Sequence, residues 1–114
     1  QCLIRLALLE ARALRESLGC LETPEGAQLL RSIGGARARQ SDDALAMQDM
    51  QAHAAALEAY AESRGIHDRL GTLRTAEGAL LLASIGTASR ASGDADGALR
   101  ALAEAREVLE ALGT

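Results

Sequence analysis

The sequence contains no phenylalanine, no tryptophan, no lysine and no asparagine, and Tyr60 is its only aromatic residue. β-Sandwiches and β-barrels need many aromatic and β-branched residues on their half-buried faces, so the composition argues against these fold classes. The apolar content nevertheless reaches 48%, most of it alanine and leucine. Together with Glu, Arg and Gln, these are the strong helix formers. The composition therefore predicts an all-α fold.

The charges are also unusual, because all 12 basic residues are arginines. Two interpretations stand side by side: the GC-rich composition of the coding sequence, or recognition of carboxylates by arginine. A net charge of −4 and a pI near 5.1 argue against general binding to nucleic acids or anionic membranes. We therefore expect a protein or peptide partner and no nucleic acid.

Long apolar runs and a secretory signal are missing as well. No apolar stretch approaches the roughly 20 residues of a membrane-spanning helix, so we expect no membrane insertion. Charged residues at Glu10 and Arg12 interrupt the apolar start, unlike a signal peptide. Cys2 and Cys20 flank one predicted helix and would lie roughly 27 Å apart, too far for a disulfide. We expect free thiols and a soluble intracellular protein, either cytoplasmic or in an organelle matrix or stroma, and not a secreted one.

Internal repetition is the main positive feature. Residues 18–34 align with residues 70–86 at an offset of 52, and residues 56–72 align with residues 98–114 at an offset of 42. Residues 4–20 also align with residues 98–114, at an offset of 94, which equals the sum of the two offsets. Self-similarity at a spacing of roughly 20–50 residues indicates a solenoid array.

Capping residues mark the ends of the predicted helices. Thr23 and Thr75 each precede a good first helical residue and a glutamate in the first turn, as at a helix N-terminus. Glycines that can close or separate helices follow the apolar-periodic runs at Gly19, Gly71, Gly93 and Gly113. The pattern predicts five helices over residues 3–18, 24–40, 43–70, 76–92 and 95–112.

Large and small residues recur at fixed positions in the predicted helix pairs. The last pair carries them at Leu82, Ile85, Gly86, Ala98, Leu102 and Ala105, and the earlier pair at Leu30, Ile33, Gly34, Ala56, Tyr60 and Ser63. Small residues allow two helices to approach closely, and the large ones fill the space beside them. On these residues the chain resembles the tetratricopeptide repeat family, in its longer kinesin-light-chain-like repeat of about 42 residues.

The resemblance implies an α-solenoid, a right-handed superhelical stack of antiparallel helix pairs with about five helices. In this interpretation, residues 1–114 form a single repeat domain. In that domain, residues 1–20 are the second helix of an incomplete repeat, residues 21–72 a repeat with a ten-residue insertion near residues 41–50, and residues 73–114 a further repeat. Neither end carries a polar capping face, so we expect the chain to belong to a longer array.

The resemblance also implies where a partner segment would bind. The first helix of each repeat lines the inner groove of such a stack, and the matching positions are Gln28, Arg31, Gly35 and Arg39 in one repeat and Leu80, Ala83, Thr87 and Arg90 in the next. Beyond their acidic first turns, these two helices carry only arginines as charged residues. A groove of this kind favours an extended acidic peptide. The alternative is that the arginines solvate an exposed face.

The insertion offers a second candidate surface. About ten extra residues near residues 41–50 would lengthen the helix that follows by roughly 15 Å beyond its partner. Leu45, Met47 and Met50 would then be free to dock a neighbouring subunit, because methionine adapts well to binding surfaces. The other interpretation is an ordinary loop, or a segment that packs on its own array.

No arrangement of residues indicates catalysis, a metal or a cofactor. The sequence has no phosphate-binding glycine motif, nucleophile elbow, Cys-x-x-Cys or His-Glu-x-x-His. His53 and His67 are 14 residues apart, about 21 Å along one helix, so they cannot share a metal ion. We interpret both as surface or hydrogen-bonded packing residues and predict no catalytic residue.

Three functions remain open at this point. The first is a protein–protein interaction scaffold that binds a partner segment in the groove. The second is a structural or accessory subunit within a large multi-protein assembly. The third is a regulatory repeat segment of a larger signalling protein or enzyme, whose catalytic parts lie elsewhere.

Uncapped ends lead to a first prediction. We expect the isolated 114-residue chain to be poorly stable or to self-associate, because both terminal helices would expose apolar faces. Thermal unfolding combined with light scattering tests this. A cooperative, monomeric transition near or above about 55 °C would contradict the expectation.

Overall fold

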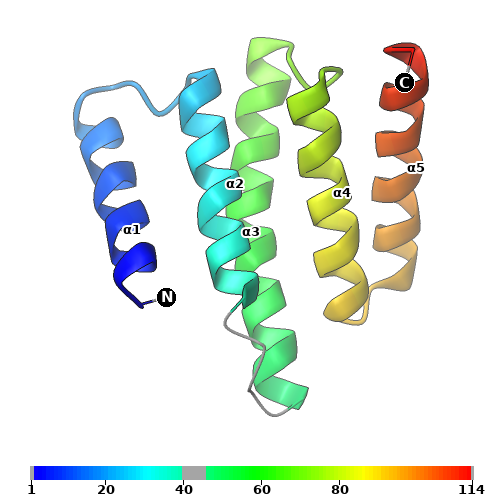
Figure 1. Cartoon of the computed structure of the whole chain (residues 1–114), viewed down its shortest axis with the longest axis horizontal. Helices are drawn as coiled ribbons and strands as arrows, with labels where there is room; N and C mark the ends of the chain where they lie inside the picture. Colours follow the sequence, from blue (N-terminus) through cyan, green and yellow to red (C-terminus); the bar gives the residue numbers. More distant parts are fainter. Residues whose placement is uncertain (1, 40–45, 114) are drawn as a thin grey trace.

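Over residues 2–39 and 46–113, which the computed structural model describes, the chain forms five α-helices that run alternately up and down (Figure 1). Their bounds are α1 Cys2–Ser17, α2 Pro24–Arg39, α3 Ala46–Leu70, α4 Ala76–Ala91 and α5 Ala95–Ala111. No strand occurs in this described part. The predicted all-α class and the five helices are confirmed, and their bounds agree within one residue except at the start of α3.

Side-chain caps explain where three of the helices begin. The hydroxyl oxygen of Thr23 accepts a hydrogen bond from the Gly26 N–H at 3.0 Å, and that of Thr75 accepts one from the Gly78 N–H at 3.2 Å. Asp94 does the same for the Gly97 N–H at 2.9 Å. Each bond satisfies a backbone donor that the first turn of a helix leaves open.

Left-handed glycines end the helices and allow the chain to reverse. The φ angles are +72° at Gly19, +71° at Gly71, +96° at Gly93 and +83° at Gly113. A side chain would strain this conformation, so glycine is the residue that suits these positions. The predicted role of these four glycines is confirmed.

Each helix packs on the next one along the chain, and α2 also contacts α4. The molecule measures 38 × 37 × 19 Å along its principal axes. Since a helix with its side chains is about 10–12 Å across, the shortest dimension corresponds to about two helices.

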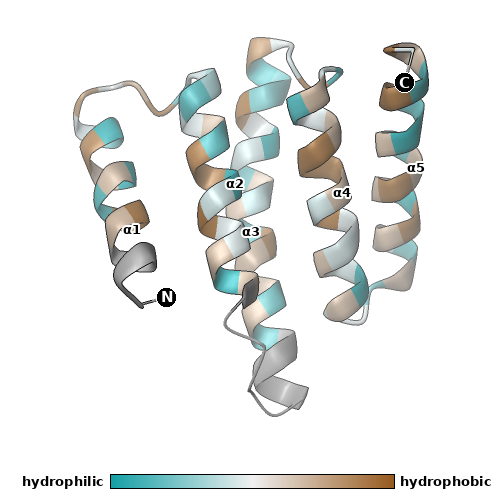
Figure 2. Cartoon of the chain, in the orientation of Figure 1, coloured by the Kyte–Doolittle hydropathy of each residue, from teal (hydrophilic) through white to brown (hydrophobic). Residues whose placement is uncertain are grey.

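Equivalent clusters of buried residues join the helices within the two repeats. Between α2 and α3 the cluster consists of Ala27, Leu30, Ile33, Ala59 and Ile66. Between α4 and α5 it consists of Ala79, Leu82, Ala105 and Val108, with the partly buried Leu73 and Ile85 against it. A third cluster, Ala56, Tyr60, Leu81 and Ala88, joins α3 to α4 and so connects one repeat to the next. Figure 2 shows apolar stretches recurring on all of the helices.

Two glycines allow a close approach between helices. A Cβ atom at Gly34 of α2 would collide with the ring of Tyr60 from α3, and one at Gly86 of α4 would lie 2.7 Å from Cγ of Leu102 in α5. The positions are equivalent in the two repeats. In each repeat, the large residue of the second helix therefore occupies the space that a missing side chain leaves on the first.

Ion pairs link segments that are far apart in the sequence. Arg12 of α1 donates to Glu62 of α3, with the closest pair of atoms 2.7 Å apart. Hydrogen bonds to Glu62 and then to Glu16 raise the pKa of Arg12 above its ordinary value. Arg69 of α3 forms a bidentate hydrogen bond with Glu22, which lies just before α2. This bond lowers the pKa of the exposed Glu22 carboxyl group. Both arrangements favour the charged forms.

The third helix is the long one. α3 spans 25 residues, whereas α2 and α4 span 16 each. Residues 46–50 of the predicted insertion are helical, and residues 41–45, including Leu45, lie outside the described residues. The side chains of Met47 and Met50 are outside the description too. The docking role of these three residues therefore stays a prediction.

A matched pair of glycine substitutions tests the close approach at Gly34. We expect Gly34→Ala to lower the free energy of unfolding by about 1–3 kcal/mol, because the new methyl group displaces the Tyr60 ring. In contrast, Gly65→Ala meets only the flexible guanidinium end of Arg69, at 3.3 Å. It should stabilise α3 by about 0.5–1 kcal/mol. Urea unfolding of both variants measures the difference, and equal effects would contradict the packing described above.

Candidate functional site

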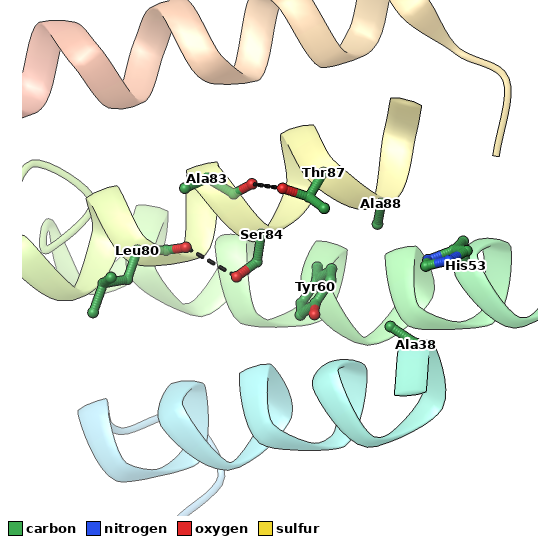
Figure 3. Close-up of a pocket in the computed structure, with 8 residues that line it drawn as sticks. All are labelled: Ala38, His53, Tyr60, Leu80, Ala83, Ser84, Thr87 and Ala88. Carbon is green, nitrogen blue, oxygen red and sulfur yellow. Dashed lines mark hydrogen bonds between the residues drawn. The ribbon is translucent and has the colours of Figure 1, made fainter. Parts of the chain in front are cut away.

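A hollow of about 290 Å³ lies between α2 and α4, over α3 (Figure 3). Its lining consists of Ala38 from α2, His53 and Tyr60 from α3, and Leu80, Ala83, Ser84, Thr87 and Ala88 from α4. Positions three, four and seven apart share one face of a helix, which is why α4 contributes most of the wall. Five of the eight lining residues are alanines, a leucine or a tyrosine, so the hollow suits an apolar group.

The two hydroxyl groups that α4 contributes to the hollow are already used as donors. Ser84 donates to the backbone oxygen of Leu80 at 3.0 Å, and Thr87 donates to that of Ala83 at 3.1 Å (Figure 3). Their oxygen atoms keep lone pairs that can accept a hydrogen bond. From α4, these two side chains therefore offer acceptors rather than donors to a bound molecule.

His53 supplies the unsatisfied polar atom of the hollow. Its Nδ1 atom is buried and has no hydrogen-bond partner among the described residues. Two of the hollow's alanines, Ala38 and Ala88, lie near the ring and carry no polar side-chain atom (Figure 3). A buried ring nitrogen without a partner is costly, and a ligand group or a water molecule at this point would remove that cost.

The two histidines thus differ from each other. The Nδ1 atom of His67 lies 2.8 Å from the hydroxyl oxygen of Thr72, and the residue is only 4% exposed. The interpretation of His67 as a hydrogen-bonded packing residue is confirmed. His53 is half-buried, and its Nδ1 atom has no hydrogen-bond partner among the described residues, so the interpretation of His53 stays a prediction.

Three of the predicted groove residues line the hollow, and the others are more widely spread. Leu80, Ala83 and Thr87 are in its wall. Arg90 follows them on α4, is exposed, and forms no ion pair with the residues that the structure describes. Gln28 is exposed on α2, Gly35 is half-buried on the same helix, and the side chain of Arg39 lies outside the described residues.

One of the predicted groove arginines, Arg31, pairs with a carboxylate. A terminal nitrogen of Arg31 lies 3.5 Å from a carboxylate oxygen of Glu77 on α4, and both side chains are about one-third to two-fifths exposed. Arg37 is also engaged, since it donates to the backbone oxygen of Ala55 on α3 at 3.1 Å. In the sequence, the acidic first turn of α4 and the arginines of α2 are far apart and gave no sign of pairing. The packing of α4 against α2 brings Glu77 and Arg31 together.

Sequence reasoning did not assign Ala38, His53, Tyr60, Ser84 or Ala88 to the site. Ser84 carried a usable signal, because it lies four residues after Leu80 on the same helix face. Tyr60 is predicted to pack between helices, and in the structure it also lines the hollow. His53 and Ala38 could not be found in this way, because only the folded chain places them beside α4.

Comparison of the chain with protein-family models, with curated proteins and with solved structures gives no match. Within residues 2–39 and 46–113, no three His, Cys, Asp or Glu residues lie together as a metal site would require. None of the helices in the described ranges is both long enough and apolar enough to span a membrane. The geometry of the hollow is therefore the evidence on which a function must rest.

A double-mutant cycle tests the contact between Arg31 and Glu77. We expect Arg31→Met and Glu77→Gln to be coupled by about 0.5 kcal/mol in the free energy of unfolding, the usual value for a pair that is partly exposed. The coupling should decrease in high salt, because ions screen the attraction. Urea unfolding of the four proteins measures it. Coupling that is zero at low salt would show that the two charges act independently.

Proposed function

We propose that this chain is a protein–protein interaction scaffold of the tetratricopeptide type and not an enzyme. In this proposal the helix pairs form a right-handed superhelical α-solenoid, and a segment of a partner binds across α2 and α4. The observation that carries the proposal is the hollow between these helices. It includes Leu80, Ala83 and Thr87, three positions at which the family resemblance places the binding groove.

The equivalent packing of the two repeats supports the proposed architecture. The Gly34–Tyr60 and Gly86–Leu102 approaches are the same contact, made once in each repeat. The α3–α4 cluster then joins one repeat to the other through Tyr60 and Leu81. In a solenoid each repeat contacts mainly its neighbours, and this division into contacts within and between repeats fits that description.

The chemistry of the hollow indicates which peptide would bind. An aliphatic or aromatic side chain of the peptide would fill the space over Tyr60 and against Leu80. A polar group next to it would satisfy Nδ1 of His53. Arg90 is exposed near the end of α4, and it is the cation that would attract a carboxylate of the peptide. Arg31 contributes less to this attraction, because Glu77 offsets its charge.

Filling the hollow with a larger side chain tests the proposal. Random peptides displayed on phage are selected on the whole chain and then measured against Ala83→Arg, which places a long side chain in the hollow. We expect a loss of affinity of about tenfold or more, as for a substitution at the centre of an interface. The control is Ala103→Arg, the same change at an exposed position of α5.

Two further results decide the outcome. Arg90→Ala should weaken the binding of selected peptides that carry a carboxylate and leave uncharged ones unaffected. Peptides that bind wild type and Ala83→Arg equally well would show that the hollow is not the binding site. A selection that yields no binding peptide at all would contradict the proposed function.

A further inference from the structure

Three polar side chains of the hollow between α2 and α4 offer lone pairs. Nδ1 of His53 is buried and has no hydrogen-bond partner among the described residues. A neutral imidazole donates from one ring nitrogen and accepts at the other, so Nδ1 is an acceptor when Nε2 carries the hydrogen. Ser84 and Thr87 have given their hydroxyl hydrogens to backbone oxygens of α4, which leaves their own oxygen atoms to accept. An occupant should therefore bring a donor to His53 and present no acceptor to the two hydroxyl oxygens.

The hollow has the size of one large side chain. Its volume of about 290 Å³ lies just below the roughly 300–1,000 Å³ of small-molecule pockets. His53 and Tyr60 are seven residues apart on α3, which places them on the same face of the helix with about 10 Å between their Cα atoms. Figure 3 shows the two rings following each other along α3, between α2 and α4. A side chain with two fused rings that packs against Tyr60 is therefore long enough to approach His53.

Tryptophan is the side chain that meets these conditions best. Its indole ring is apolar over most of its surface and carries one N–H donor and no acceptor. Phenylalanine would fill the space but leave Nδ1 of His53 without a partner. Tyrosine, asparagine and glutamine carry acceptor oxygens, which would meet the lone pairs of Ser84 and Thr87. Lysine and arginine would bring a charge that none of the eight described lining residues compensates with a carboxylate.

We infer that the hollow binds the indole ring of a tryptophan in the partner peptide, with the indole N–H donated to Nδ1 of His53. The ring packs against Tyr60 and against the alanines that α2 and α4 contribute to the lining. This inference rests on the proposed function, because it names the residue by which the groove recognises its peptide. His53 is then a specificity-determining residue, while Arg90 acts on a carboxylate elsewhere in the same peptide.

The composition of the chain makes the first test direct. The protein contains no tryptophan, so the tryptophan fluorescence of a complex comes from the peptide alone. Among the phage-displayed peptides selected on the whole chain, those that Ala83→Arg weakens should carry a tryptophan. On binding, their emission should shift to shorter wavelength, because the indole ring leaves water for an apolar site.

Replacement of a single atom group in the peptide tests the hydrogen bond. In benzothienylalanine a sulfur atom takes the place of the indole N–H, and the shape of the ring system is nearly unchanged. We expect the peptide with this residue to bind the wild-type chain about tenfold more weakly than the tryptophan peptide, because Nδ1 of His53 stays unpartnered. Isothermal titration calorimetry measures both affinities.

Two substitutions of His53 locate the effect on the protein. His53→Leu should bind the two peptides with equal affinity, since it lacks the acceptor. His53→Asn should restore part of the preference for tryptophan, because its side-chain oxygen can accept a hydrogen bond at a similar distance from the backbone. Urea unfolding checks that both variants are folded, and His53→Leu should not be destabilised, because it removes a buried polar atom that has no partner.

The outcomes separate the inference from the proposed function. Peptides that Ala83→Arg weakens but that contain no tryptophan would overturn the inference and leave the function in place. Equal binding of the tryptophan and benzothienylalanine peptides to the wild-type chain would overturn it as well, and so would a preference that His53→Leu retains. A selection without any binding peptide would remove the proposed function, and the inference with it.

Discussion

Two positions without a side chain hold the helices of this protein at their close spacing. At Gly34 and Gly86 the ring of Tyr60 and the side chain of Leu102 occupy space that any Cβ atom would fill. Because these contacts are made once in each repeat, they set how the second helix lies on the first. Each repeat also has its own buried cluster between the same two helices, from Ala27 to Ile66 in one and from Ala79 to Val108 in the other.

The contact between Gly34 and Tyr60 also determines which side of Tyr60 faces the next repeat. Tyr60 is held over Gly34, and so its other side is presented to Leu81 and Ala88 of α4. This junction places α4 beside α2 and leaves the hollow over α3 between them. The proposed binding site therefore originates from one large residue, Tyr60, which contacts the first helices of two repeats.

Charge plays a smaller and more local part than the composition implies. Arginines of successive second helices pair with glutamates of the next, as Arg12 does with Glu62 and Arg64 with Glu104. These pairs are partly exposed, so each contributes little to stability on its own. Because the charges meet in only one register of the helices, the pairs favour that register over others. Arg31 and Glu77 follow the same principle inside the groove, where pairing lowers the positive charge that a partner would meet.

Local residue patterns determined the helical class, the number of helices and nearly all of their ends. Caps such as Thr75, left-handed glycines such as Gly71 and the spacing of apolar residues act within a few residues of the chain, so they can be recognised without a structure. The pairing of large residues with glycines was predictable as well, because the repeat displays it twice. The hollow, the unpartnered Nδ1 atom of His53 and the pairing of Arg31 with Glu77 required the tertiary structure. Each depends on which side chain of one helix meets which side chain of another, and that relation is decided only when α2, α3 and α4 pack together.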